Sequence, residues 1–345
     1  MSDLPNLPEQ DPYFPEDPPP PQDTAAHEPY LVALPPAESV SLQPHTDAPL
    51  SDYPQDPYPD ETPQLFKDHF IPEMRPQERI PNLGHLGILI LLALCGLFGA
   101  GLLAGLAVHF HLFGISNMQQ AATDIHYTLG TEGAFYILTF AASLLVFPFL
   151  WHKGFFDGLQ WRGATALKLR GRLVSAAALC FVLAMFNSMV MPGPADAPID
   201  RIFRMPGAAW LLFGFGVTLA PFFEEMAFRG FLLPALSTAW DWAIEKSTGR
   251  PALPLDTDGH PQWSFFAMAI GSVITSILFA LIHGDQTGWS LGPFLLLVCV
   301  SLVLCWARLS TRSLAASVLV HASYNFLLFS LMFLGTSGFK HLDKM

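Results

Sequence analysis

The stretch LGILILLALCGLFGAGLLAGLAVHF, residues 86–110, decides the fold class of this chain. It contains no Asp, Glu, Lys or Arg, and it is longer than the ~20 apolar residues that a helix needs to cross a bilayer. A soluble helix keeps a polar face toward water, and this stretch has none. We therefore expect a transmembrane helix here.

Six further apolar segments follow, at residues 132–151, 172–192, 207–239, 264–283, 290–307 and 313–334. Segment 207–239 is too long for one straight crossing and contains Pro221 and Pro234, so we expect either a kink or a span followed by a surface helix. The sequence thus predicts an all-α fold: a polytopic transmembrane bundle of seven or eight helices in the lipid bilayer of the cell membrane.

The first 82 residues differ from the rest. They hold 16 Asp and Glu against three Lys and Arg, and about 20 of the 31 prolines, which predicts a disordered, acidic, proline-rich tail. The rest of the chain is nearly neutral, so no basic surface suggests nucleic acid as a partner. We divide the chain into this tail (1–82), N-terminal transmembrane helices (83–200), a second transmembrane part (201–335) and a short C-terminal tail (336–345).

The positions of lysine and arginine orient the predicted bundle. The connections rich in Lys and Arg are residues 152–171, 240–263 and 308–312, whereas 111–131 and 284–289 contain none. Because cytoplasmic loops carry the excess of positive charge, we expect these three connections and the N-terminal tail in the cytoplasm.

Three charges interrupt the stretch APFFEEMAFRGFLLPAL, residues 220–236. Charged side chains inside a bilayer are costly and usually functional. On a helix Glu225 and Arg229 are four residues apart on one face, whereas Glu224 points about 100° away. We expect Arg229 to neutralise Glu225, a pair that could equally be structural, and Glu224 to be left for chemistry.

Two later segments carry the other polar side chains. His283 ends one segment, with Phe279 one turn before it on the same face, and His321 and Asn325 share a face of the last segment. A carboxylate such as Glu224 can take a proton from water, and a His and an Asn can donate hydrogen bonds to the resulting oxyanion. Together they could hydrolyse an amide without a Ser or Cys nucleophile.

Three motifs in this order resemble a known family. The sequence reads EEMAFR at 224–229, FALIH at 279–283 and HASYN at 321–325. This set resembles the CPBP family of intramembrane proteases, which includes type II CAAX prenyl endopeptidases and abortive-infection proteins. The resemblance covers about residues 205–330 and does not extend to the tail.

The resemblance implies an intramembrane glutamic endopeptidase and gives each singled-out residue a role. Those roles are water activation by Glu224 with His283, an oxyanion hole of His321 and Asn325, and a site held together by Glu225, Arg229 and Phe279. The implied substrate is a membrane-associated protein or peptide, prenylated or not, while the oligomeric state is left open.

Three alternatives stay open. Two His and two Glu could bind zinc, but the HExxH pairing of zinc proteases is absent, so we expect no cofactor. The same fold could serve a non-catalytic scaffold or a bacteriocin-immunity protein. A transporter with a proton relay is less favoured, because no inverted repeat is visible.

The depth of the site residues conflicts with these span boundaries. Counting 1.5 Å per residue, Glu224 falls on the cytoplasmic side and His283 toward the opposite side. Either the boundaries are wrong or the cavity is funnel-shaped. The polar connection 241–263 could cap or gate such a cavity.

Overall fold

The computed structural model describes residues 79–194, 197–205 and 207–340. All of them belong to one of the two units into which the chain divides, Glu73–Met345. The expected disordered tail therefore lies outside the described residues, apart from 79–82, and so do residues 341–345 of the expected C-terminal tail. The boundary between 83–200 and 201–335 stays a prediction.

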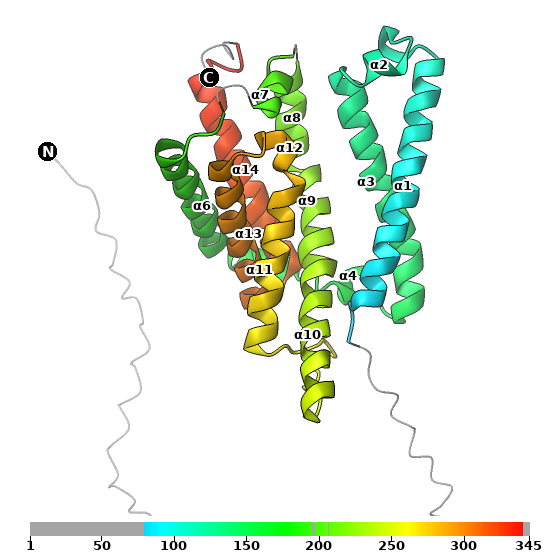
Figure 1. Cartoon of the computed structure of the whole chain (residues 1–345), viewed down its shortest axis with the longest axis vertical. Coiled ribbons are helices and arrows are strands. Elements are labelled where there is room, and N and C mark those ends of the chain that lie inside the picture. The colour runs from blue at the N-terminus through cyan, green and yellow to red at the C-terminus, as the bar shows by residue number, and fades with distance from the viewer. Residues whose placement is uncertain (1–78, 195–196, 206, 341–345) are drawn as a thin grey trace, which may run out of the picture. The chain divides into compact units, whose positions relative to one another are not determined.

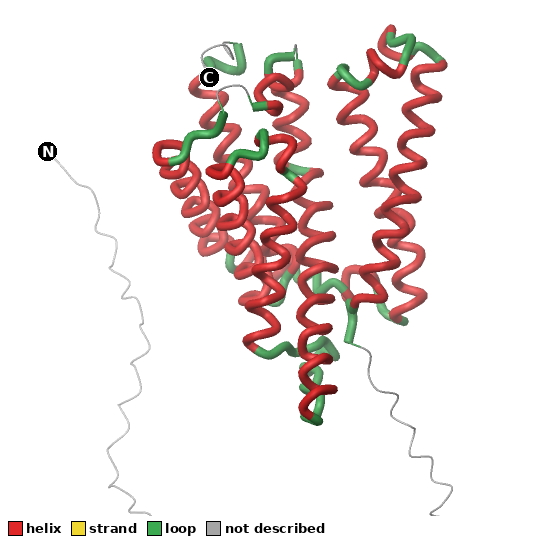
Figure 2. The backbone as a smooth tube through the Cα atoms, in the orientation of Figure 1, coloured by secondary structure: helices red, strands yellow, loops and turns green. Residues whose placement is uncertain are grey.

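Seven helical segments in the described part of the chain are long and apolar enough to cross a membrane. They are α1 (Leu83–His109), α3 (Ile125–Trp151), α6 (Arg170–Val190), a continuous segment Ala208–Thr248, α11 (Phe265–Ile282), α13 (Leu291–Thr311) and α14 (Leu314–Gly335). No strand occurs among the described residues (Figure 2). The all-α, polytopic fold is confirmed.

Short helical elements occupy the connections between these segments. They are η2 (Leu112–Gly114), α2 (Met118–Ala121), α4 (Phe155–Gly158), α5 (Gly163–Lys168), α7 (Pro198–Phe203) and α12 (Gly284–Thr287). The long helices lie side by side in Figure 1, with α1 against α3, α11 against α10 and α13, and α14 against α6, α8 and α9.

The segment Ala208–Thr248 is one helical column with a break. It consists of α8 (Ala208–Val217), α9 (Leu219–Glu225), the π-helix η3 (Met226–Leu232) and α10 (Leu233–Thr248). Thr218 between α8 and α9 has φ −115° and ψ −70°, and this φ is about 50° from that of a regular α-helix. Pro221 lacks an N–H and its ring crowds the carbonyl of residue 217, which accounts for the break. The structure thus places an interruption of the α-helix close to Pro221, and the choice between a kink and a surface helix stays a prediction.

The connection after this segment begins later than expected. Helix α10 continues to Thr248, so the polar connection covers residues 249–264 rather than 241–263. It folds back along α10: the Ser264 amide donates to an Asp241 carboxylate oxygen over 2.9 Å, and the Trp263 indole N–H donates to the Thr238 hydroxyl over 3.0 Å.

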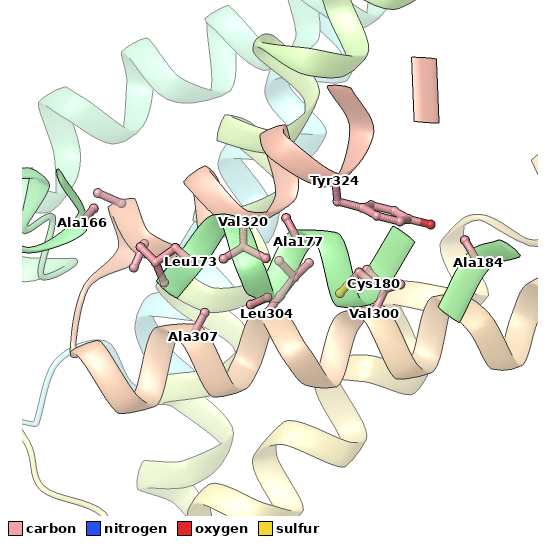
Figure 3. Packing of buried hydrophobic residues seen from close by; sticks show 13 residues of the cluster. Ala166, Leu173, Ala177, Cys180, Ala184, Val300, Leu304, Ala307, Val320 and Tyr324 are labelled. Atoms are coloured by element: carbon pink, nitrogen blue, oxygen red, sulfur yellow. The ribbon is translucent and has the colours of Figure 1, made fainter. Parts of the chain in front are cut away.

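Fully buried alanines allow α6, α13 and α14 to approach closely, among them Ala177, Ala307 and Ala316. Figure 3 shows buried residues of these helices facing one another, among them Leu173, Ala177 and Cys180 of α6, Val300, Leu304 and Ala307 of α13, and Val320 and Tyr324 of α14. Inside a membrane, close packing of small residues is a main source of helix association. This core fixes α14, which carries two of the expected site residues.

Aromatic side chains join the α1–α3 pair to the π-helix. The ring of Phe231 in η3 lies 4.7 Å from that of Phe147 and 5.7 Å from that of Trp151, both in α3. Phe147 and Phe231 are fully buried. These contacts hold α3 beside the segment that carries Glu224 and Glu225.

Candidate active site

Helices α10 and α11 bring Glu224 and His283 to the same depth. Asp241 and Ser264 are hydrogen-bonded and so mark a common level. Counting back from Asp241 to Glu224 and forward from Ser264 to His283 gives 17 and 19 residues, a difference of about 3 Å at the helical rise.

The same counting places His321. A Cβ atom on Gly230 would lie 3.3 Å from a methyl group of Leu314, so these residues are level. Glu224 is six residues before Gly230, and His321 is seven after Leu314. At the helical rise these counts place Glu224 and His321 within about 1.5 Å of the same depth. The expected difference in depth between Glu224 and His283 is therefore wrong: the ends of the spans are staggered, whereas the sequence count assumed that they share a plane.

Two imidazoles lie beside the carboxylate of Glu224. Nε2 of His283 and Nε2 of His321 are each 3.9 Å from Oε2 of Glu224. This distance is too long for a direct hydrogen bond and fits a bridging water. The Glu224 side chain is 15% exposed, so it is accessible within an otherwise apolar region.

Hydrogen bonds fix which ring nitrogen of each histidine carries a proton. Nδ1 of His283 lies 2.7 Å from the Phe279 carbonyl, and Nδ1 of His321 lies 2.9 Å from Oε1 of Glu225. Both oxygens accept, so both Nδ1 atoms donate. In a neutral ring Nε2 is then an acceptor directed toward Glu224.

Glu225 and Arg229 form the expected pair, which is confirmed. Nη1 of Arg229 donates to Oε1 of Glu225 over 2.9 Å, and both side chains are fully buried. No sequence motif indicated a third member, Ser301 of α13, whose carbonyl and hydroxyl oxygens accept from Nη2 of Arg229. The guanidinium thus ties the π-helix to α13.

Phe279 contacts most of this cluster. Its ring lies 4.6 Å from that of His283 and 5.9 Å from that of His321, and the guanidinium carbon of Arg229 lies 4.7 Å from its centroid. The stacking on Arg229 is a cation–π contact. The expectation that Phe279 walls the site agrees with this position.

Asn325 holds the break in the long segment. Its Nδ2 donates to the carbonyl of Gly216 over 2.7 Å, where the break at Thr218 interrupts the helical ladder. One amide hydrogen of Asn325 is engaged in this way and the second is left for another acceptor. Asn325 therefore has a structural partner that the HxxxN spacing could not indicate.

A cavity of about 660 Å³ adjoins Glu224. It lies between α1, α3, α11 and the α9–η3 segment, and its wall is otherwise almost wholly apolar, with side chains such as Leu89, Phe223 and Leu278. No residue of 249–264 lines it, so the capping role expected for that connection is not seen. A cavity of this size suits a bulky ligand.

Sequence reasoning missed two polar residues near this cavity. Tyr136 lines it, stacks on Phe223 with ring centroids 4.9 Å apart, and donates to Glu132 over 3.0 Å. The expected span began at residue 132, which left Glu132 at its edge. Asp124 caps α3 through the amides of His126 and Tyr127, so the helix starts at Ile125 and Glu132 lies inside it. The Asp124 cap was the signal that could have found them.

In the described ranges, no group of three or more His, Cys, Asp or Glu side chains has an arrangement that could hold a metal ion. That the protein needs no cofactor remains a prediction, which cleavage in the presence of a zinc chelator would test.

The comparisons with known proteins agree with the motifs. No curated protein and no solved structure matches the chain. Residues 206–327 match the family model described as "Type II CAAX prenyl endopeptidase Rce1-like". The matched range runs from the start of α8 into α14 and includes all seven expected site residues. Residues 206–327 of this multi-pass membrane protein therefore form a domain of the Rce1-like family, a family of proteases.

Proposed function

We propose that this protein is an intramembrane endopeptidase that hydrolyses a peptide bond with a water molecule activated by Glu224. The observation that carries the proposal is the position of two imidazole Nε2 atoms 3.9 Å from one Glu224 oxygen, at the wall of an apolar cavity of about 660 Å³. The family of residues 206–327 supports the reaction class.

The first step is attack by water. Glu224 takes one proton from the water, Nε2 of His283 accepts a hydrogen bond from the other, and the water oxygen forms a bond to the carbonyl carbon. The tetrahedral oxyanion then collapses, the C–N bond breaks, and Glu224 returns its proton to the leaving amine. Glu224 thus ends the cycle as a carboxylate.

The oxyanion needs hydrogen-bond donors. Nδ1–H of His321 is already directed at Glu225, so Nε2 of His321 donates only when the ring carries both protons. Oε1 of Glu225 remains the acceptor of the Nδ1–H of that ring. The second amide hydrogen of Asn325 is the other donor in this proposal, which keeps the roles expected for His321 and Asn325.

The cavity defines the substrate class in this proposal. Its wall combines one carboxylate, Glu224, with apolar side chains from α1, α3 and α11, which suits an apolar chain more than a polar peptide. We propose a membrane-associated protein or peptide, with a prenylated C-terminal peptide as the first candidate because the family model carries that description. The protein would act in the cell membrane with its N-terminal tail in the cytoplasm.

The test uses the full chain in lipid nanodiscs with prenylated and unmodified C-terminal peptides. The intact protein should cleave at least one of them, and Glu224→Gln should not, although it should still insert and unfold at a similar temperature. Full cleavage by a folded Glu224→Gln protein would overturn the role of Glu224.

Two further arms separate the alternatives. Cleavage that survives a zinc chelator supports the metal-free reaction, whereas loss on chelation and recovery with zinc supports the zinc-dependent version. A biological function that persists in a Glu224→Gln/His321→Ala double variant identifies a scaffold or immunity protein instead.

A further inference from the structure

A second pocket lies at the end of the bundle opposite His283, next to the Lys- and Arg-containing connections. It measures about 210 Å³ and is bounded by the α4–α5 connection, residues 261–263, the start of α11 and the end of α13. None of its lining residues lines the cavity beside Glu224, so the two are separate sites.

The floor of this pocket is a buried arginine. Arg308 was expected in the 308–312 connection, but it lies in the last turn of α13 and is 2% exposed. Its guanidinium donates to the side-chain oxygen of Gln160 over 2.8 Å and to the carbonyls of Leu159 and Arg229. All three are neutral acceptors, and in the part of the chain that the structure describes Arg308 has no carboxylate partner.

A buried charge without a counter-ion is costly. The second charged residue of the lining, Arg312, is also cationic, and its side chain is 52% exposed at the mouth of the pocket. Its partner Asp256 does not line the pocket. The lining therefore carries two guanidinium groups and no carboxylate, which favours an anion.

The chemistry and the volume of the pocket indicate which kind of anion would fit it. Met268 and Leu309 give the pocket an apolar side, while Gln262 adds a polar group near the two arginines. Arginine forks match phosphate oxygens in pairs, and basic pockets between transmembrane helices bind phosphate-bearing lipid head groups. The volume has room for roughly seven waters at about 30 Å³ each, enough for a phosphate group.

We propose that this pocket binds a phosphate group, supplied by the head group of an anionic phospholipid or by free phosphate, with Arg308 and Arg312 as its ligands. Arg308 also bonds the carbonyl of Arg229, so an occupant would steady the π-helix next to the candidate active site. This site is independent of the proposed peptidase activity and is tested by binding alone.

The variant for the test changes one charge at the pocket with little change in shape. Gln262→Glu places a carboxylate beside the arginines and keeps the contacts that Arg308 makes with Gln160, Leu159 and Arg229. Gln119→Glu, on the exposed surface of α2, is the matched control for an added negative charge. Arg312→Gln is a second pocket variant in case Gln262→Glu fails to fold.

The measurement is native mass spectrometry of the full chain with phosphatidylglycerol, phosphatidylcholine or inorganic phosphate added. The intact protein and Gln119→Glu should retain phosphatidylglycerol in preference to phosphatidylcholine, because the choline cation of the latter offsets the phosphate charge and competes with the two arginines for it. Arg312→Gln should bind phosphatidylglycerol about tenfold more weakly, as expected for the loss of one hydrogen bond to a charged group. Gln262→Glu should also bind it about tenfold more weakly, because its added carboxylate repels the phosphate.

The phosphate arm identifies the source. Competition by inorganic phosphate shows that the phosphate group alone suffices, whereas variant-sensitive lipid binding without competition shows that the site needs the head group on its lipid. Equal retention of both lipids, or equal binding by Gln262→Glu, Arg312→Gln and the control, would overturn the proposal.

Discussion

Two neighbouring glutamates at the end of α9 have opposite environments. Glu225 is fully buried and shares its Oε1 between Arg229 and His321, each over 2.9 Å. In contrast, Glu224 is 15% exposed, faces two imidazoles across 3.9 Å and lines an apolar cavity.

This difference teaches how one helix carries both structural and reactive charges. A fully buried carboxylate held by fixed partners, as Glu225 is through Oε1, stabilises the fold and is closed to bulk water, although its Oε2 has no partner among the described residues. A carboxylate with neighbours just beyond hydrogen-bond distance keeps room for a water molecule. The π-helix begins at Met226, directly after this pair, and such elements occur frequently at functional sites.

The largest expected effect follows from removing the charge of Glu224, the glutamate beside the cavity. Glu224→Gln removes the proton acceptor, so kcat should fall about 10³-fold, within the range for general acid–base groups. Cleavage assays in nanodiscs measure this, with Glu245→Gln at the far end of α10 as the control that should stay near the intact rate. A similar fall in both variants would contradict a specific role for Glu224.

The next largest effect follows from breaking the buried ion pair of Glu225 and Arg229. Arg229→Met leaves the buried Glu225 without its counter-ion, which should lower the free energy of unfolding by about 3–5 kcal/mol. Denaturant unfolding in detergent measures it. The Glu225→Gln/Arg229→Met double variant removes both charges and should recover much of the loss; an unchanged stability of Arg229→Met alone would show that the pair is dispensable.

A smaller effect tests the hinge between α8 and α9. Asn325→Ala removes this donor to the Gly216 carbonyl and should lower the free energy of unfolding by about 1–3 kcal/mol. Asn325→Asp lacks the amide donor and should not restore it. If Asn325→Ala loses turnover but keeps full stability, Asn325 serves the oxyanion alone.

The smallest effect concerns the connection 249–264, away from both glutamates. Burial lowers the pKa of His260. Burial raises the pKa of Asp256. Hydrogen bonds from the amides of His260 and Asp258, and the charges of His260 and Arg312, lower this pKa by more than burial raises it, so the net shift is downward. Both groups bind protons more weakly when folded, so their stabilisation is present at neutral pH and declines with falling pH.

The decline should begin near pH 6.5, the ordinary value of histidine, and continue as Asp256 is protonated at lower pH. Hydrogen exchange of residues 249–264, corrected for intrinsic rates, should therefore become faster between pH 7 and pH 5. His260→Gln should flatten this trend. Faster exchange at neutral than at acidic pH would contradict the assigned shifts.

Hydropathy and helical spacing predicted much of this arrangement. Long apolar runs require helices in a bilayer, and a four-residue spacing requires Glu225 and Arg229 to meet on one face. These are local properties, so the spans and the ion pair could be read from the chain.

The remainder depends on contacts between distant residues. The stagger of the spans follows from the Asp241–Ser264 hydrogen bond, and the ligands of Arg229 and Asn325 come from Ser301 and Gly216. No local pattern encodes those partners. Arg308 shows the same limit, because a basic residue at the end of an apolar run looks like a loop charge until its buried acceptors are known.

The most direct test of the central claim compares Glu224→Gln and Glu225→Gln in both cleavage and thermal unfolding. If Glu224 has the catalytic role and Glu225 the structural one, Glu224→Gln should lose cleavage at an unchanged unfolding temperature. Glu225→Gln should unfold at a clearly lower temperature and keep more cleavage per folded molecule than Glu224→Gln. The same loss of cleavage and stability in both variants would contradict this division of roles.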